Sequence, residues 1–373
     1  MSTGFRQDQV SAARVMVVGC GALGNEVLKN LVLMGVTHIV AVDFDVVETG
    51  NLSRSILFSK ADAEKRRRKV EVVEERLRQI NPSVDIRTIH GDIAYDIGLG
   101  LVRQMDVIIG CVDSRWARYC INRLAMRAGR PWVDGAIDGL EGTARVFMPG
   151  KNCYACNLGP EGLKDLTRRM PCAGIIRRQE AAGAVPTTAI AASVIGAVQV
   201  QEALKLVQKD FGTSLCGRMF YYDGEHMTVR TAAYQAYDDD CPEHELWEPV
   251  GKTKVDVTMT VKEALSNWSE ELSATDVTLC LANDCFVDYV SRRDNDERTY
   301  VMRPGRQVEE FVEQDRSLCG LPATALYQHD YRHIGTGFPY PDQKLSQIGI
   351  PQDDIVRVVA DGKEFFLELR IEN

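Results

Sequence analysis

The glycine-rich turn near the N-terminus constrains the fold more than any other stretch of this sequence. The apolar run 15–18 leads directly into the turn 19–24, which reads G-C-G-A-L-G. Such a run predicts a buried strand, a tight turn and a helix start, which together offer backbone N–H groups to phosphates. A second apolar run, 38–42, ends at Asp43, about 20 residues on, where dinucleotide folds place an acid near the ribose. The pattern predicts a doubly wound, mostly parallel α/β sheet that binds a nucleotide. It leaves the chemistry open, because many dehydrogenases and flavoenzymes share it.

The residues after this acid narrow the choice of chemistry. Asp43-Phe44-Asp45 is followed by Asn51-Leu52-Ser53-Arg54. A hydride-transferring enzyme needs no fixed cation here, whereas an enzyme that attacks a nucleotide phosphate does. The order of glycine loop, D-x-D and N-L-x-R resembles that of the ThiF/MoeB and ubiquitin-activating (E1-like) adenylyltransferases, which have a Rossmann-like fold.

This resemblance implies an ATP site and gives each matched residue a role. Asp43 would hold the ribose beside Asp45, Asn51 would orient a phosphate oxygen, and Arg54 would balance charge on the pyrophosphate side. The phosphates would lie on the loop formed by Gly19, Gly21, Ala22, Leu23 and Gly24.

A basic segment follows. Residues 60–79 are predicted to form one helix, closed by Asn81-Pro82. A run of charges usually marks a solvated face. In the resembled family, however, a lysine that opens a K-x-E-x-A helix reaches the phosphates. Lys69 matches that position with two extra residues before it, and the insertion makes Lys65 a rival.

Asp113 follows the apolar run 105–111, which predicts a strand. A carboxylate at the end of a parallel strand lies at the edge where doubly wound folds bind ligands. The alternative is a helix N-cap. The resemblance favours contact with Mg²⁺ and the phosphates.

Two pairs of soft ligands predict a closed metal site. Cys153-Tyr154-Ala155-Cys156 is a C-x-x-C pair, and Cys241-Pro242-Glu243-His244 is a C-x-x-H pair. Two such pairs are the spacing of a tetrahedral structural zinc site. The resembled family has its second pair in the same place, as C-x-x-C, so His244 is a departure that still gives a Cys3His set. The alternative is four side chains without a metal.

The stretch between these pairs, 157–188, corresponds to the family's crossover loop, which carries the acceptor cysteine in members that form a thioester. Cys172 is the only thiol within it. Neighbouring arginines would lower its pKa and favour the thiolate. In some relatives the acceptor lies about five residues before P-T-T, a register that falls here on Ala181. Cys172 therefore serves as acceptor, or the nucleophile is replaced by alanine, or the protein only adenylates.

The last third changes in pattern. The pattern predicts an adenylation domain over 1–248 and a small α+β domain over 249–373, with strands at 277–281, 285–291, 299–302 and 325–333 and a helix at 307–314. A short helix over 344–351 and a terminal hairpin closed by Asp361-Gly362 are also predicted. This order resembles the β-grasp ubiquitin-fold domain that recruits a conjugating enzyme. A generic α+β appendage is the alternative.

Charge and composition exclude some partners. The chain has 373 residues, a formal charge of −9, a pI near 5.3 and 11 cysteines. This acidity argues against nucleic acid or anionic membrane as a partner. Without an apolar leader or an 18-residue apolar run, we expect a cytoplasmic protein. The resemblance implies a homodimer, but the family's N-terminal crossing arginine has only Arg6 as a weak substitute.

The predicted activity is therefore ATP-dependent adenylation of the C-terminal carboxylate of a ubiquitin-like protein, followed by thioester formation and transfer to a conjugating enzyme. The same fold would also serve adenylation alone, for sulfur-carrier biosynthesis of the molybdopterin or thiamin type. An NAD- or FAD-binding oxidoreductase would leave Arg54 and Lys69 without a role. A catalytically inactive scaffold subunit would have no need of Arg54.

Overall fold

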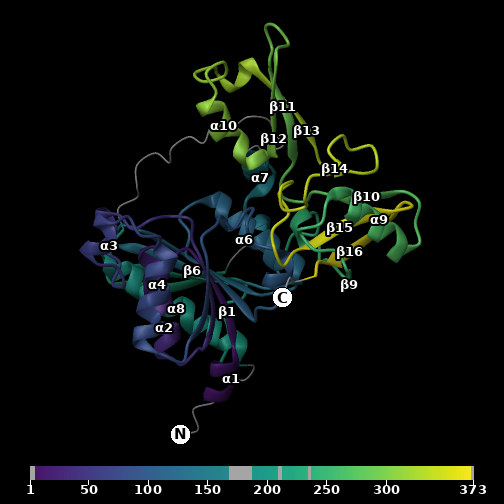
Figure 1. Cartoon of the computed structure of the whole chain (residues 1–373). Coiled ribbons are helices and arrows are strands. Elements are labelled where there is room, and N and C mark those ends of the chain that lie inside the picture. Colours follow the sequence, from purple (N-terminus) through teal and green to yellow (C-terminus); the bar gives the residue numbers. More distant parts are fainter. Residues whose placement is uncertain (1–4, 168–186, 209–211, 234–236, 371–373) are drawn as a thin grey trace. The chain divides into compact units, whose positions relative to one another are not determined.

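The computed structural model describes residues 5–167, 187–208, 212–233 and 237–370 (Figure 1). The chain forms two compact units. Among the described residues, the first unit comprises 5–93, 102–159, 187–208, 212–233 and 237–246, and the second comprises 94–101, 160–167 and 247–370. Two short segments of the second unit, 94–101 and 160–167, thus interrupt the first unit along the chain. The long C-terminal part of the second unit begins at Trp247.

The first unit is built on one eight-stranded mixed sheet. Its strands lie in the order β3-β2-β1-β4-β5-β6-β7-β8. The first five run parallel and the last three continue antiparallel. Their bounds are β1 Arg14–Val18, β2 His38–Val42, β3 Asp85–Ile89, β4 Val107–Gly110, β5 Trp132–Asp138, β6 Glu141–Phe147, β7 Arg218–Asp223 and β8 Thr228–Ala233. The α/β class predicted from the sequence is confirmed, with a mixed sheet in place of a mostly parallel one.

The core of this unit forms where apolar helix faces cover the parallel strands. Val15 and Val17 of β1 pack with Val27, Leu28 and Leu31 of α2 in one buried cluster. The apolar spacing along α2 (Ala22–Leu33) places these side chains on one face. The other helices are α1 Gln7–Ala12, α3 Lys60–Glu64, α4 Lys69–Ile80, α5 Leu99–Arg103, α6 Arg115–Ala128, α7 Gly159–Thr167 and α8 Ala189–Val207, with short 3-10 turns η1 Thr49–Asn51, η2 Ala155–Asn157 and η4 Pro242–His244.

Helix α8 is long and apolar enough to cross a membrane by length and composition. Half of its most apolar window is nevertheless buried inside the protein. Ile195, Val200 and Leu204 of this helix belong to the same core cluster as β1 and α2. These features are those of a core helix, so the helix is weak evidence for a membrane span.

The single helix predicted over 60–79 is wrong. Two helices, α3 and α4, occupy this stretch, separated by a turn in which Arg66 has a φ of 46°. Arg68 pairs with Val46 in an isolated antiparallel bridge, which a continuous helix could not do. The sequence pattern hid the break because the intervening residues, Lys65 to Arg68, are good helix formers.

The second unit contains two sheets, each with its own apolar cluster. A five-stranded sheet has the order β14-β10-β15-β16-β9, and a three-stranded sheet has the order β12-β11-β13. Val261, Leu265 and Trp268 of α9 (Val261–Leu272) pack on the first sheet. Its strands are β9 Val250–Lys252, β10 Val277–Cys280, β14 His333–Ile334, β15 Ile355–Ala360 and β16 Lys363–Glu368; the second sheet has β11 Phe286–Arg292, β12 Arg298–Pro304 and β13 Leu326–Tyr331, beside η5 Gly305–Gln307, α10 Val308–Gln314 and η6 Ala323–Ala325.

Most predicted elements of this unit are present, with two differences. The stretch 325–333, expected to form one strand, instead forms two successive strands, β13 and the short β14. The helix expected over 344–351 is wrong: these residues form successive turns, and Gly349 takes a φ of 103° that ends any helical run. The Asp361-Gly362 turn between β15 and β16 is confirmed, with both residues at positive φ. The β-grasp assignment stays a prediction.

Candidate functional site

The glycine loop joins β1 to α2 and needs its glycines for two different reasons. A Cβ at Gly19 would lie 2.4 Å from the carbonyl oxygen of Cys111, and one at Gly24 would lie 1.9 Å from that of Gly19. Gly21, by contrast, faces open space, and it immediately precedes the first residue of α2. The outer glycines therefore allow tight packing, while the middle one leaves room in front of the helix N-terminus, where N–H groups attract anions.

Asp43 fastens this loop to the end of β2. Its Oδ2 accepts a hydrogen bond from the backbone N–H of Cys20 (2.6 Å between N and O), and its Oδ1 accepts one from Asp45 (2.7 Å). Burial raises the pKa of Asp43, although Lys69 and the two backbone N–H groups oppose that rise. Each carboxylate oxygen can accept a second hydrogen bond. The predicted contact with a ribose hydroxyl stays a prediction.

Lys69 is the cation that the structure places beside the D-x-D pair. Its Nζ lies 2.7 Å from Oδ2 of Asp45, and its side chain is only 9% exposed. Burial alone would lower the pKa of Lys69, but attraction from Asp43 and the bond to Asp45 raise it overall, so the ammonium stays charged. Lys65 lies exposed in the turn after α3. Of the two rivals, only Lys69 contacts the D-x-D acids.

The N-L-S-R motif is linked to the glycine loop by a residue that the sequence analysis missed. Asn25, fully buried on α2, donates through Nδ2 to the carbonyls of Cys20 (2.8 Å) and Gly21 (3.0 Å). Its Oδ1 accepts from the backbone N–H of Leu57 at 2.8 Å. Asn25 therefore holds the loop and the segment after Arg54 at a fixed separation. No motif rule singles out this asparagine.

Within that segment, the two predicted site residues have different surroundings. Asn51 closes the short η1 turn, with its Oδ1 accepting from the N–H of Glu48 at 2.9 Å. Arg54 is half-buried, and its Nη1 donates to the carbonyl of Gly50 at 2.9 Å. The described residues hold no acid in salt-bridge contact with Arg54.

Asp113 lies exposed just beyond β4, two residues after Cys111, which backs onto Gly19. The N-cap of α6 is Ser114, whose Oγ accepts from the N–H of Ala117 at 3.0 Å. The alternative that Asp113 serves as the helix cap is therefore wrong. The part of the chain that the structure describes shows no side-chain hydrogen bond or ion pair of this carboxylate.

A second feature missed from the sequence is a buried charge cluster within β5, opposite the end of β4. Asp134, fully buried, lies between Arg118 of α6 and Arg145 of β6. Arg118 donates through Nε to Asp134 at 2.9 Å and through Nη2 to the carbonyl of Val112 at 2.7 Å. Burial alone would raise the pKa of Asp134, but the two guanidinium groups lower it overall. The contact to Val112 ties this cluster to the segment carrying Asp113.

Cys153, Cys156, Cys241 and His244 converge as predicted. Their ligand atoms all lie within 4.8 Å of one another. Sγ of Cys153 is 3.7 Å from Sγ of Cys156 and 3.8 Å from Sγ of Cys241, while Nε2 of His244 is 3.1 Å from Sγ of Cys156. Segments 88 residues apart thus meet in one cluster that could hold a metal ion. Cys172 and Ala181, by contrast, lie outside the described residues.

Comparison with known proteins gives a family match and several relatives. The model of the ThiF family matches residues 3–243. SAMP-activating enzyme E1 of Haloferax volcanii is 34% identical over 239 residues, which cover 63% of this chain and 82% of that protein. The mouse adenylyltransferase and sulfurtransferase MOCS3 is 34% identical over 236 residues, covering 63% of this chain but only 48% of that protein.

A further relative and two solved structures are also similar to this chain. Molybdopterin-synthase adenylyltransferase of Haemophilus influenzae is 29% identical over 228 residues, covering 60% of this chain and 86% of that protein. Escherichia coli MccB solved with ATP has a TM-score of 0.51 and 21% identity, covering 63% of this chain and 68% of that one. MccB solved with N-formylated MccA has a TM-score of 0.52 and 21% identity, covering 64% and 69%. At this identity the two structures show a shared fold. Because the family model spans well over half of the sequence, this chain belongs to the ThiF family.

Proposed function

We propose that this protein uses ATP to adenylate the C-terminal carboxylate of a ubiquitin-like protein. A carboxylate oxygen attacks the α-phosphorus, the bond to the bridging oxygen of the β-phosphate breaks, and an acyl adenylate and pyrophosphate result. The observation that carries the proposal is the charged Lys69, buried against Asp45 beside a glycine loop with open space at Gly21. The relatives named above as adenylyltransferases and as an activating enzyme support it.

Two anions must meet in this reaction, so catalysis depends on positioning and charge neutralisation. The glycine loop and the N-terminus of α2 would bind the phosphates, and Asp43 the ribose. Asn51, Arg54 and Lys69 would contact the phosphates and the leaving pyrophosphate. The exposed carboxylate of Asp113 is a hard oxygen ligand, as Mg²⁺ prefers, and would hold a magnesium ion that shields the phosphate charges.

We also propose that the cysteine–histidine cluster holds a structural zinc ion. In a tetrahedral site with Zn–S bonds of about 2.3 Å, sulfur atoms lie about 3.8 Å apart. The 3.7 and 3.8 Å separations found here match that value. Four protein ligands leave no open position for water, so the ion would stabilise the fold and take no part in the reaction.

Two alternative steps are proposed after adenylation. In the first branch, Cys172 takes the acyl group as a thioester, AMP leaves, and the C-terminal unit presents a conjugating enzyme. In the second branch, the protein only adenylates a sulfur carrier, which the names of MOCS3 and the molybdopterin-synthase enzyme favour. Treating the purified protein with ATP and a ubiquitin-like protein, followed by intact mass spectrometry, separates the branches. A thiol-sensitive adduct lost in Cys172→Ala supports the first.

The adenylation step itself is tested by ATP–pyrophosphate exchange that requires a ubiquitin-like protein. We expect Arg54→Ala and Asp113→Ala each to abolish the exchange, Lys69→Ala to slow it strongly while leaving a measurable rate, and Cys172→Ala to retain it. Lys65→Ala is the matched control for Lys69, since Lys65 is exposed. Exchange at the wild-type rate in Lys69→Ala, or a bound dinucleotide in the purified protein, would contradict the proposal.

Two further proposals concern the whole protein. Its resemblance to the family supports a homodimer, which analytical ultracentrifugation would test. Its acidic composition and ordinary globular make-up support a cytoplasmic location and argue against nucleic acid or membrane as partners. Imaging of a tagged chain in cells would test the location.

A further inference from the structure

The break between α3 and α4 contains a backbone conformation that needs support. Arg66 has a φ of 46°, in the left-handed region that is unfavourable for a residue with a Cβ. Such conformations persist where surrounding contacts fix them, often near functional sites. The break lies directly before Lys69, the first residue of α4.

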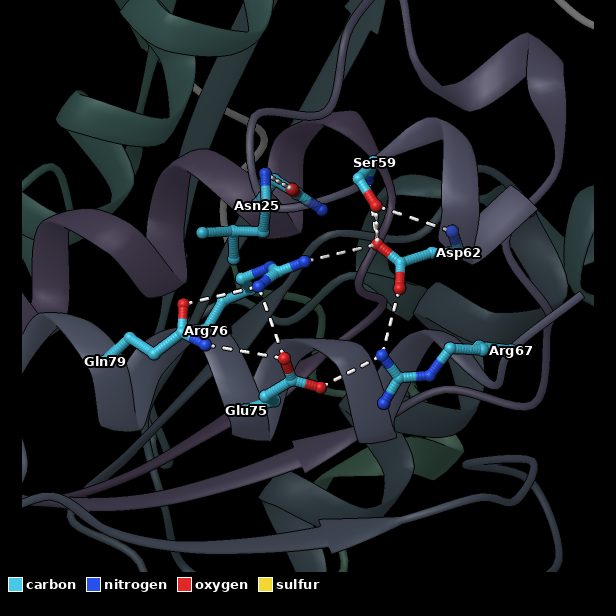
Figure 2. A network of polar contacts seen from close by, with 8 residues as sticks. Asn25, Ser59, Asp62, Arg67, Glu75, Arg76 and Gln79 are labelled. Atoms are coloured by element: carbon cyan, nitrogen blue, oxygen red, sulfur yellow. Dashed lines mark hydrogen bonds and ion pairs between the residues drawn. The ribbon is translucent and has the colours of Figure 1, made fainter. Parts of the chain in front are cut away.

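A polar network holds both sides of this turn (Figure 2). The carboxylate of Asp62, on α3, accepts from the N–H and the hydroxyl of Ser59 at 2.9 and 2.5 Å. It also contacts Nη1 of Arg67 at 2.9 Å and Nη2 of Arg76 at 3.6 Å. Glu75, on α4, joins the same two arginines, at 2.9 Å to Arg67 and 3.2 Å to Arg76. The network therefore links α3, the turn and α4.

The carboxylate of Asp62 is the centre of the network. Its side chain is 4% exposed, whereas that of Glu75 is 43% exposed. Burial alone would raise the pKa of Asp62, but the bonds from Ser59 and Arg67 lower it overall, so the group stays ionised near neutral pH. A buried carboxylate with several charge-assisted bonds fixes its partners more firmly than an exposed one does.

The turn held in this way sets the position of Lys69 through the backbone. The N–H of Val47 donates to the carbonyl of Arg67 at 2.8 Å, and the N–H of Lys69 donates to the carbonyl of Asp45 at 3.0 Å. These bonds flank the Val46–Arg68 bridge. Lys69 consequently starts α4 directly against the D-x-D segment, with its Nζ on Asp45.

We propose that Asp62 is a positioning residue for Lys69: through Arg67 and Arg76 it fixes the turn that aims the ammonium group of Lys69 at the nucleotide site. The catalytic part of this inference rests on the proposed adenylation. The positioning part does not, because it concerns only the backbone bonds and the place of Lys69.

The first test needs no substrate. Hydrogen exchange of the full chain is measured at the amides of Val47 and Lys69 in wild type, Asp62→Asn and Glu64→Gln. We expect exchange about tenfold faster or more in Asp62→Asn, the size expected when charge-assisted bonds to a buried carboxylate are lost. Glu64 is exposed on α3 and pairs only loosely with Lys60, at 3.7 Å, so Glu64→Gln should keep wild-type exchange.

The second test uses ATP–pyrophosphate exchange in a double-mutant cycle. We expect Asp62→Asn to lower the rate and raise the KM for ATP, and Asp62→Asn combined with Lys69→Ala to be no slower than Lys69→Ala alone. Glu75→Gln, which removes the outer carboxylate, should give a smaller effect of the same kind and replaces Asp62→Asn if that variant does not fold. Arg67→Lys, which keeps a charge, should retain more of the wild-type exchange rate than Arg67→Gln.

Amide exchange at wild-type rates in Asp62→Asn would overturn the proposal, whatever the kinetics. So would rate losses that multiply in the double mutant, because that result means Asp62 acts independently of Lys69. If the wild-type protein shows no pyrophosphate exchange with any ubiquitin-like protein, the proposed adenylation fails. The amide exchange then still decides whether Asp62 positions Lys69.

Discussion

Asp134 shows how much the interior of the first unit depends on single side chains. It is fully buried between Arg118 and Arg145, and Arg118 in turn contacts the carbonyl of Val112. Two guanidinium groups and one carboxylate therefore neutralise one another inside β5, where solvent is excluded. Removing one partner of such a buried ion pair strongly destabilises the fold, because the remaining charge is left uncompensated.

We predict that Asp134→Asn lowers the free energy of unfolding by about 3–5 kcal/mol, the usual cost of breaking a buried ion pair. Urea denaturation at pH 7 measures the change. Asp138→Asn, at the exposed end of the same strand, is the control and should alter stability little. Because the folded pKa of Asp134 lies below its ordinary value, the stabilisation is present above that value and is lost as the pH falls. Wild-type stability in Asp134→Asn would contradict this account.

At single residues, the sequence predicted those that belong to a spaced motif. Gly19, Gly24 and Asp43 follow from spacing and Lys69 from the family resemblance, and the structure brings them together. Asn25 and Asp134 follow from no spacing rule. Their importance comes from tertiary contacts with Leu57 and with Arg118, which lie far away in the chain. Such contacts are invisible in a periodic pattern.

At the scale of elements, the strands were easier to predict than the helix boundaries. The parallel strands β1, β2 and β4 are apolar runs that end at or just before a glycine or an aspartate, and both features are local. The break between α3 and α4 is not local, since it depends on pairing of Arg68 with Val46. The helix predicted over 344–351 is wrong although Gly349 and Pro351 lie in that stretch, because both lie at its end and leave the apolar spacing before them unbroken.

The loop before β11 also carries a titratable element. Asp284 is buried and pairs with Arg306 of η5 at 3.1 Å, and Arg306 contacts Asp96 at 3.3 Å. Burial raises the pKa of Asp284 from its ordinary value of 3.8 to about 6, even though Arg306 opposes the rise. Arg306 therefore joins three segments of the second unit. One of its partners, Asp284, takes up a proton in mildly acidic solution.

We predict that Asp284 gives the second unit a distinct pH dependence. Between pH 4 and 6 the folded chain holds a proton that the unfolded chain has released, so the contribution of Asp284 falls as the pH rises. The slope is at most about 1.4 kcal/mol per pH unit. In urea unfolding from pH 4 to 7, the stability of wild type relative to Asp284→Asn should fall up to about pH 6 and then stay constant. Asp342→Asn, an exposed control, should leave the slope unchanged.

At the scale of the whole molecule, three apolar clusters of the described residues each lie within one unit. One cluster surrounds β1 and α2 in the first unit, and two others lie in the second unit, without a residue in common. The cysteine–histidine cluster belongs entirely to the first unit. Units with their own cores need not unfold together.

We predict two calorimetric transitions, of which metal removal affects one. Chelation of zinc, or Cys241→Ser, should lower the melting temperature of the first unit, because a bound structural ion contributes its binding free energy to folding. The transition of the second unit should stay in place. Cys319→Ser, at an exposed thiol of the second unit, is the control. One transition that shifts as a whole on chelation would contradict the prediction, and elemental analysis should find one zinc per chain.

The segment 94–101 bears on how this protein can be shortened. It follows β3 of the first unit, yet it packs in the second, where the N–H of Leu99 donates to Asp354 at 2.8 Å and that of Leu101 to the carbonyl of Asp353 at 3.0 Å. A gene fragment stopped at codon 246 would keep Tyr95, Ile97 and Leu99, all nearly inaccessible to solvent in the intact chain, and discard what shields them. Such a fragment would aggregate and express poorly, even with its nucleotide loop intact.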